Sequence, residues 1–178
     1  MPKSDNKHAI NMYNGIEQNI GRAAADEFTQ SLPLSKSADY LKKSKWAEGV
    51  CAWLEERYPE DAVRKIRMAC ACSPGNKSDR VKTMYEASAD NADFCERFNK
   101  EYAPGNIMYC EGDSLFLTYP ECYCSCVKRD DRQLSKTWCY CSLGYVDVLF
   151  SHALSRKVQV ELLESVKTGG SKCVMKIT

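Results

Sequence analysis

The spacing of apolar residues changes near Ala103, and this change constrains the fold more than any other feature of the sequence. Before it, apolar residues recur at intervals of three and four, as they do over residues 8–28, which predicts a helix there. "SLPLSKS" ends this pattern, and "SPGN" marks a strong stop further on. Further helices are predicted to begin near Ser37, Pro59, Ser78 and Asn91.

After this point the pattern is typical of strands. "NIMYCEGDSLFLTY" predicts a hairpin that turns at Glu111-Gly112-Asp113. A helix is expected from about Ser142, followed by the strands "KVQVELLESV" and "KCVMKI" on either side of Gly169-Gly170. This order predicts an α+β fold, in which N-terminal helices pack with an antiparallel sheet of about four strands. We expect a single domain over residues 1–178, with a helical half 1–104 and a sheet and thiol-cluster half 105–178.

The charge balance and the N-terminal residues narrow the classes of partner. Lys and Arg number 25 against 24 Asp and Glu, a net charge of +1 that provides no field for binding nucleic acid. "MPKSDNKHAI" contains no apolar signal core, and no stretch is long and apolar enough to cross a membrane. We therefore expect a cytoplasmic protein that binds neither nucleic acid nor membranes, and the oligomeric state stays open.

The chain contains 11 cysteines, and seven of them form three Cys-x-Cys clusters. Disulfides in the cytoplasm are usually transient, so these cysteines are interpreted as metal ligands, reactive thiols or buried residues. In an extended segment, residues two apart point to the same side. The sulfurs within each cluster would then project together: Cys70 and Cys72; Cys122, Cys124 and Cys126; Cys139 and Cys141.

The leading hypothesis is a thiolate-ligated zinc site. Tetrahedral zinc needs four ligands, and we predict Cys122, Cys124, Cys139 and Cys141, with Cys126, Cys70 and Cys72 as contenders. Such a site would fix the loop between the hairpin and the last helix and would line a small-molecule pocket. An open position on the metal would support hydrolysis by bound water. Cys-x-Cys is a weaker signal for zinc than Cys-x2-Cys. The alternatives to zinc are therefore an iron–sulfur cluster or no cofactor at all.

Two other functions fit the sequence. A hydrolase or redox enzyme would use a nucleophilic cysteine, with Cys139 and Cys141 as candidates because a helix N-terminus favours thiolate. Glu164 is a further catalytic candidate, since it alternates with Val160 and Leu162 on an apolar face, where a carboxylate must be paired, hydrogen-bonded or protonated. If the strand ends earlier, Glu164 instead meets water. The remaining function is a non-catalytic small-molecule sensor or binding module.

The other histidines and cysteines have simpler interpretations. His152 is expected to be solvated near the end of a helix, so a Cys–His pair would need His8. The cysteines outside the clusters are interpreted as core or strand-face residues, since free cysteine is among the most buried residue types: Cys51, Cys95, Cys110 and Cys173.

The C-terminal third resembles known families. "GYVDVLFSHALSRKVQVELLESVKTGGSKCVMKI" is similar to the closing helix and strands of 4-vinyl reductase-type small-molecule-binding domains. With "YPECYC" and "WCYCSLGY", it resembles still more a cysteine-rich bacterial family of unassigned function related to L-2-amino-thiazoline-4-carboxylic acid hydrolase. The resemblance is carried by Gly144, Tyr145, Phe150, Glu164-Ser165, Gly169 or Gly170, and Cys173. It implies an α+β domain that holds a small ligand or a metal, and it transfers no catalytic residues.

Overall fold

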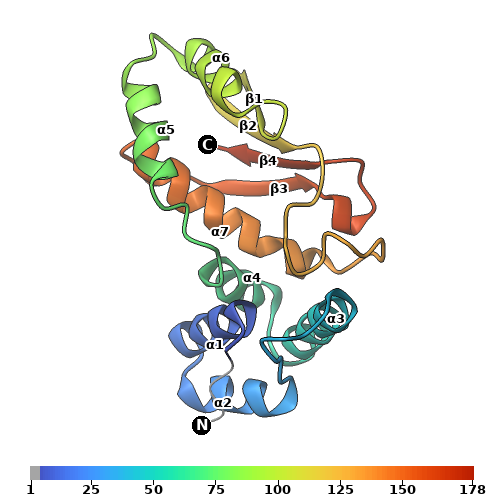
Figure 1. Ribbon diagram of the computed structural model, residues 1–178. Helices are drawn as coiled ribbons and strands as arrows, with labels where there is room; N and C mark the ends of the chain where they lie inside the picture. Colours follow the sequence, from blue (N-terminus) through green and yellow to red (C-terminus); the bar gives the residue numbers. More distant parts are fainter. Residues whose placement is uncertain (1–4) are drawn as a thin grey trace. The chain divides into compact units, whose positions relative to one another are not determined.

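The computed structural model describes residues 5–178 (Figure 1), and these form two compact units. Unit 1 comprises the residues up to Cys72 together with Cys124–Gly144, and unit 2 comprises Ser73–Tyr123 together with Tyr145–Thr178. The division differs from the two predicted halves, because residues 73–104 belong with the sheet and the cysteine-bearing loop after Tyr123 belongs with the first helices. Residues 1–4 of the predicted domain lie outside the described residues.

Unit 1 is helical. It contains α1 (Lys7–Asn19), α2 (Arg22–Ser31), α3 (Tyr40–Arg57), α4 (Glu60–Ala69) and the first half of α7 (Lys136–Ala153). The single helix predicted over residues 8–28 is wrong, because the chain breaks at Gly21, whose φ of 120° is a conformation that favours glycine. The side chain of Asn6 caps α1 by accepting a hydrogen bond from the His8 amide at 3.0 Å.

An aromatic cluster forms the core of unit 1. The Phe28 ring meets the rings of Trp46 and Trp53 edge-on, with centroids 6.2 Å and 5.3 Å apart. Trp46 in turn meets Trp138 of α7 at 5.9 Å, and its indole nitrogen donates to the Leu32 carbonyl at 2.9 Å. These contacts hold α2, α3 and α7 around one apolar centre.

Unit 2 is an antiparallel sheet with helices. Its strands are β1 (Ile107–Glu111), β2 (Ser114–Tyr119), β3 (Val160–Glu164) and β4 (Cys173–Ile177), in the order β1-β2-β4-β3. Its helices are α5 (Lys77–Glu86), α6 (Asn91–Tyr102), the second half of α7 and a short 3-10 turn, Val166–Thr168. The predicted α+β fold with four antiparallel strands is confirmed.

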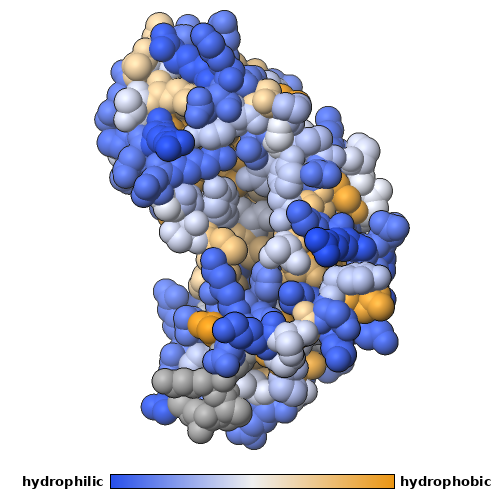
Figure 2. All heavy atoms as spheres, in the orientation of Figure 1, coloured by the Kyte–Doolittle hydropathy of each residue, from blue (hydrophilic) through white to orange (hydrophobic). Residues whose placement is uncertain are grey.

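The surface is mostly polar. On the face that Figure 2 shows, hydrophilic side chains dominate and hydrophobic ones form small separate patches. Among residues 5–178, no helix combines the length and the hydrophobicity needed to cross a membrane.

Candidate functional site

The two thiols at the start of α7 point to different sides of a helix. The sequence predicted an extended segment up to about Ser142, which is wrong, because α7 begins at Lys136 and contains both Cys139 and Cys141. Residues two apart on an α-helix are separated by about 200° around its axis. These two sulfurs therefore do not project together.

The Cys122–Cys126 run is also less regular than predicted. Cys124 begins a turn, in which its carbonyl accepts hydrogen bonds from the amides of Val127 and Lys128 at 3.0 Å and 2.9 Å. Cys126 lies within that turn and is buried, whereas Cys122 and Cys124 are half-buried. Cys122 belongs to unit 2, and the other clustered thiols belong to unit 1.

The predicted zinc site gains no support from this arrangement. Within the part of the chain that the structure describes, no three His, Cys, Asp or Glu side chains are grouped so that they could hold a metal ion. Zinc ligation by Cys122, Cys124, Cys139 and Cys141 stays a prediction from the sequence, as do the roles of Cys126, Cys70 and Cys72 as alternative ligands.

The structure instead places a buried arginine among the thiols of unit 1. Arg67 of α4 is only 2% exposed. Its Nε donates to the Thr137 carbonyl at 3.2 Å and one Nη to the Trp138 carbonyl at 2.7 Å, while the other Nη contacts the Met12 sulfur at 2.8 Å. The guanidinium carbon also lies 4.4 Å from the centre of a Trp138 ring. Among residues 5–178, Arg67 forms no ion pair with a carboxylate. Its buried positive charge is instead stabilised by two backbone carbonyls, the Met12 sulfur and the face of the Trp138 ring.

The ionisable groups that act most strongly on Arg67 are cysteines. Burial acts to lower the pKa of Arg67, but four thiols outweigh it and leave that pKa raised. We call this group the Arg67 cluster, and it consists of Arg67, Cys51, Cys70, Cys124 and Cys141. It joins α3, α4, α7 and the loop after Tyr123 within unit 1.

Burial and the arginine act in opposite directions on these thiols. Burial raises the pKa of Cys51 to about 12 and that of Cys70 to about 11, while Arg67 acts to lower both. The pKa of Cys141 is also raised, chiefly by burial, and Arg67 is the largest influence that lowers it. Arg67 thus favours the thiolate form, which burial alone would disfavour.

Close helix packing brings Cys70 to this position. The Cys70 sulfur lies 3.4 Å from the Met12 sulfur and donates to the Ile66 carbonyl at 3.0 Å. A Cβ atom on Gly15 of α1 would lie only 2.5 Å from the Cys70 sulfur. The absence of a side chain at Gly15 therefore lets α1 pack against the end of α4.

His8 reaches the loop that carries two of the thiols. Its Nε2 is hydrogen-bonded to the hydroxyl of Ser125 at 3.2 Å, between Cys124 and Cys126 in the sequence. Its pKa is lowered, first by burial and then by the positive charges of Lys43 and Arg67. The histidine that a Cys–His pair would require is thus held beside this loop, mainly in its neutral form at neutral pH.

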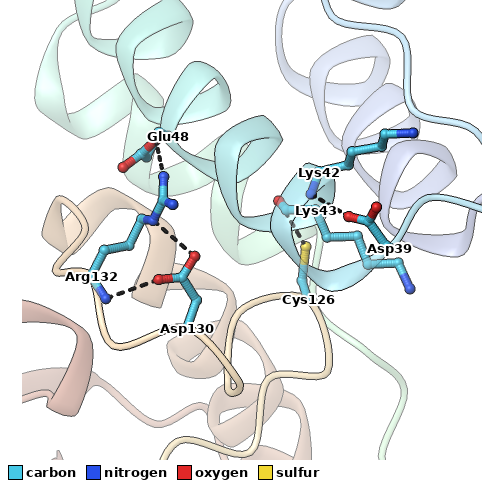
Figure 3. Close-up of polar contacts among 7 residues, drawn as sticks. All are labelled: Asp39, Lys42, Lys43, Glu48, Cys126, Asp130 and Arg132. Carbon is cyan, nitrogen blue, oxygen red and sulfur yellow. Dashed lines mark hydrogen bonds and ion pairs between the residues drawn. The ribbon is translucent and has the colours of Figure 1, made fainter.

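The same loop is tied to α3 at two points (Figure 3). The Cys126 thiol donates to the Lys43 carbonyl at 3.5 Å, and Arg132 forms an ion pair with Glu48 at 2.9 Å. Asp130 accepts from both the backbone amide and the side chain of Arg132, at 3.1 Å and 2.8 Å. These contacts anchor the loop within its turn, at Cys126, and after it, at Arg132, and so help to position Cys124 in the Arg67 cluster.

Arg67 was missed from the sequence, although a signal was present. Val63, Ile66, Arg67 and Cys70 follow the spacing i, i+3, i+4 and i+7, which places the arginine on the apolar face of its helix. A charged residue at such a position is the unusual feature, because arginine is rarely buried without a partner.

Glu164 has a structural role. Its carboxylate accepts hydrogen bonds from the Ser171 amide at 2.7 Å, the Ser171 hydroxyl at 3.1 Å and the Lys172 amide at 3.3 Å. A bulge between Leu162 and Glu164 interrupts the alternation on which its prediction as a buried pocket acid depended. Its pKa is lowered, chiefly by the Ser171 amide, so this carboxylate caps the β3–β4 connection in its ionised form.

We expect Glu164→Gln to reduce the sensitivity of the fold to acid. Because the pKa of Glu164 is lowered in the folded state, its ionised form stabilises the protein above the ordinary glutamate pKa, and this contribution is lost as pH falls through the lowered value. Between about pH 7 and about pH 3, the melting temperature of the wild type should fall further than that of the variant. Glu161→Gln, at an exposed position on the same strand, should behave like the wild type.

The remaining residues lie largely where the sequence placed them. His152 is exposed in the last turn of α7, and its Nε2 lies 2.9 Å from the Asp79 carboxylate. Cys51 and Cys95 are buried, while Cys110 and Cys173 are half-buried on strands β1 and β4. Cys51 nevertheless belongs to the Arg67 cluster, which its interpretation as a simple core residue did not foresee.

Comparisons with known proteins give a family and two distant structural likenesses. Residues 5–178 match the family described as "Family of unknown function (DUF6144)", rather than the hydrolase-related or vinyl reductase-type families that the C-terminal pattern resembles. No curated protein matches the chain. The fold is similar to the Shewanella oneidensis H-NOX domain in the Fe(II)CO ligation state (14% identity, TM-score 0.48, covering 97% of this chain and 96% of that chain). It is also similar to an S. oneidensis H-NOX protein mutant in the Fe(II) ligation state (14%, 0.45, 97% and 94%). Likenesses this distant assign no function to the chain.

Proposed function

Because the chain belongs to DUF6144, a family of unknown function, we propose its function from its own residues: it is a small-molecule sensor that captures a thiol-reactive ligand at the Arg67 cluster. The observation that carries this proposal is the buried guanidinium, which lies among four thiols and has no carboxylate partner among the described residues. A cation in this position stabilises the anion that forms when a thiol loses its proton to react.

Cys141 is the thiol best suited to react. It is half-buried, so a small molecule can reach it more readily than the buried Cys51 and Cys70. Among the cysteines, Cys141 has the largest influence on Arg67. Its thiol donates a long hydrogen bond to the Trp138 carbonyl at 3.5 Å, and this weak bond is lost at little cost when the proton leaves.

The positions of the other candidate groups favour capture over catalysis. A hydrolase needs an acid or a base beside its nucleophile. Glu164, the predicted acid, caps a turn in unit 2, and His152 pairs with Asp79 in that unit. His8 lies in unit 1, but its Nε2 is hydrogen-bonded to the Ser125 hydroxyl and not to a thiol. Capture requires only a thiol that loses its proton as it reacts and a positive charge that stabilises the anion, and both belong to the Arg67 cluster.

Iodoacetamide labelling of the full chain tests this proposal. Each cysteine is followed by mass spectrometry over a range of pH, and Cys139, which lies on the other side of the same helix, serves as the internal reference for Cys141. Arg67→Gln should slow labelling of Cys141 about tenfold, the equivalent of one pKa unit, and should move its rate profile to higher pH. Arg67→Lys should restore part of the rate, because it keeps the positive charge.

Lys65→Gln is the matched control, since it removes one positive charge from an exposed position on α4. It should leave the labelling of Cys141 unchanged. If Arg67→Gln does not fold, Arg67→Lys is compared with the wild type in the same way. An unchanged ratio of the Cys141 rate to the Cys139 rate when Arg67 is replaced would contradict the proposal.

The zinc hypothesis is tested separately by elemental analysis of freshly purified, untagged protein. Bound zinc whose removal by a chelator lowers the melting temperature would favour the predicted thiolate ligands. Metal-free protein with an unchanged melting temperature would rule them out and leave the Arg67 cluster free to bind its ligand.

A further inference from the structure

Two cysteines of unit 2 are neighbours in space, although they are 15 positions apart in the sequence. Cys95 is on α6 and Cys110 is on β1, and Cys110 is the ionisable group that acts most strongly on Cys95. Cys95 is 6% exposed, whereas Cys110 is half-buried and so open to small reagents. No sequence pattern pairs them, since each is a single cysteine outside the Cys-x-Cys clusters.

A second contact explains why these thiols meet. The side-chain amide of Asn99 on α6 donates to the Met108 carbonyl and accepts from the Met108 amide, both at 2.7 Å. From Asn99, Cys95 lies four residues back along the helix, a rise of about 6 Å. From Met108, Cys110 lies two residues along the strand, about 6.6 Å, on the same face. Because the two distances match, the Asn99 contact sets the register that brings the sulfurs together.

We propose that Cys95 and Cys110 form a reversible disulfide when a hydroperoxide oxidises the protein. This proposal concerns unit 2 and does not depend on the Arg67 cluster of unit 1. The bond would fix α6 to β1 beside the Asn99 contact, so the oxidation state of the cell would set how firmly this helix is held on the sheet.

The chemistry divides between the two thiols. The Cys110 sulfur, as thiolate, attacks one peroxide oxygen; the O–O bond breaks, and the departing hydroxide takes up a proton to become water. The Cys95 sulfur then attacks the resulting sulfenic acid, displaces hydroxide as a second water and gives up its proton. For hydrogen peroxide, two thiols thus lose two electrons and two protons, and the peroxide is reduced to two waters.

The environment of Cys95 suits the second role. Burial, and then the neighbouring Cys110, raise the pKa of Cys95 to about 12, so it stays protonated and does not compete for the peroxide. Once Cys110 is a sulfenic acid, Cys95 is the neighbouring thiol that can attack it. The disulfide is therefore favoured over further oxidation of Cys110.

The test treats the reduced full chain with hydrogen peroxide, blocks the remaining thiols with iodoacetamide in denaturant and maps peptides without reduction. The expected product is a linked pair of peptides containing Cys95 and Cys110, lighter than their sum by two hydrogen atoms and separated by dithiothreitol. Cys95→Ser or Cys110→Ser should abolish it. Cys173→Ser, a half-buried thiol on β4 of the same unit, should not change it.

The Arg67→Gln variant should also keep this disulfide, which separates the result from the fate of the proposed sensor. Cys110 oxidised to sulfinic acid while Cys95 remains alkylated would overturn the proposal. Random pairing of Cys95 with cysteines of unit 1 would overturn it equally. Both outcomes are measurable on the wild type, so the test holds even if a serine variant does not fold.

Discussion

Gly144→Ala is expected to lower the free energy of unfolding by about 4 kcal/mol or more, which is a large part of the stability of an ordinary domain. A Cβ atom at this position would lie 2.1 Å from the Met68 carbonyl oxygen and 2.7 Å from its carbon. Both atoms belong to the backbone of α4, which moves only if the helix moves. The substitution should therefore separate α7 from α4 and disturb the Arg67 cluster between them.

Urea unfolding followed by circular dichroism measures this effect, and Gly49→Ala is its matched control. Gly49 also lies within a helix of unit 1, but an added Cβ there meets first the end of the Leu32 side chain, at 3.0 Å. A flexible side chain gives way at little cost, and alanine exceeds glycine in helix propensity by about 1 kcal/mol. Gly49→Ala should thus be neutral or stabilising, and a similar result at Gly144 would contradict the close packing of α7 on α4.

Phe94→Ala is expected to cost about 3–5 kcal/mol, the usual range for removing a fully buried aromatic ring. Phe94 of α6 is 0% exposed. Its ring meets Tyr85, Phe98 and Phe150 edge-on, with centroids 5.1, 6.3 and 6.5 Å away. It therefore joins α5, α6 and α7 within unit 2, and alanine would leave a cavity among three rings.

Chemical denaturation of the variant and of Leu163→Ala measures the difference. Leu163 is an apolar side chain on β3 that is 49% exposed, and its truncation should change the free energy of unfolding by less than about 0.5 kcal/mol. A cost below about 1 kcal/mol for Phe94→Ala would mean that the neighbouring rings collapse into the space.

The sheet could be predicted because its signals are local. "EGD" supplied the turn of the first hairpin, where Gly112 has a φ of 56°, and period 2 marked the strands on both sides. The start of α7 was predicted too late, although Ser135 was a visible signal. Its hydroxyl accepts a hydrogen bond from the Thr137 amide at 3.3 Å, as helix-capping serines do.

The sequence identified some of the residues of the candidate site but not how they are grouped. The Cys-x-Cys clusters supplied Cys70, Cys124 and Cys141, but the spacing rule paired Cys141 with Cys139, which lies on another side of the helix. Arg67 and Cys51 joined the group through tertiary packing between helices far apart in the sequence. Spacing within a segment carries no information about such contacts, because they depend on which helix faces meet.

The three tryptophans of the chain, Trp46, Trp53 and Trp138, all belong to unit 1. Indole fluorescence excited near the red edge of absorption therefore reports on this unit alone, while the tyrosines and phenylalanines of unit 2 contribute no signal there. Since the Arg67 guanidinium lies over the Trp138 ring, any event that moves this cation should alter the emission of Trp138. The molecule thus carries its own optical probe of the cluster, and it needs no attached dye.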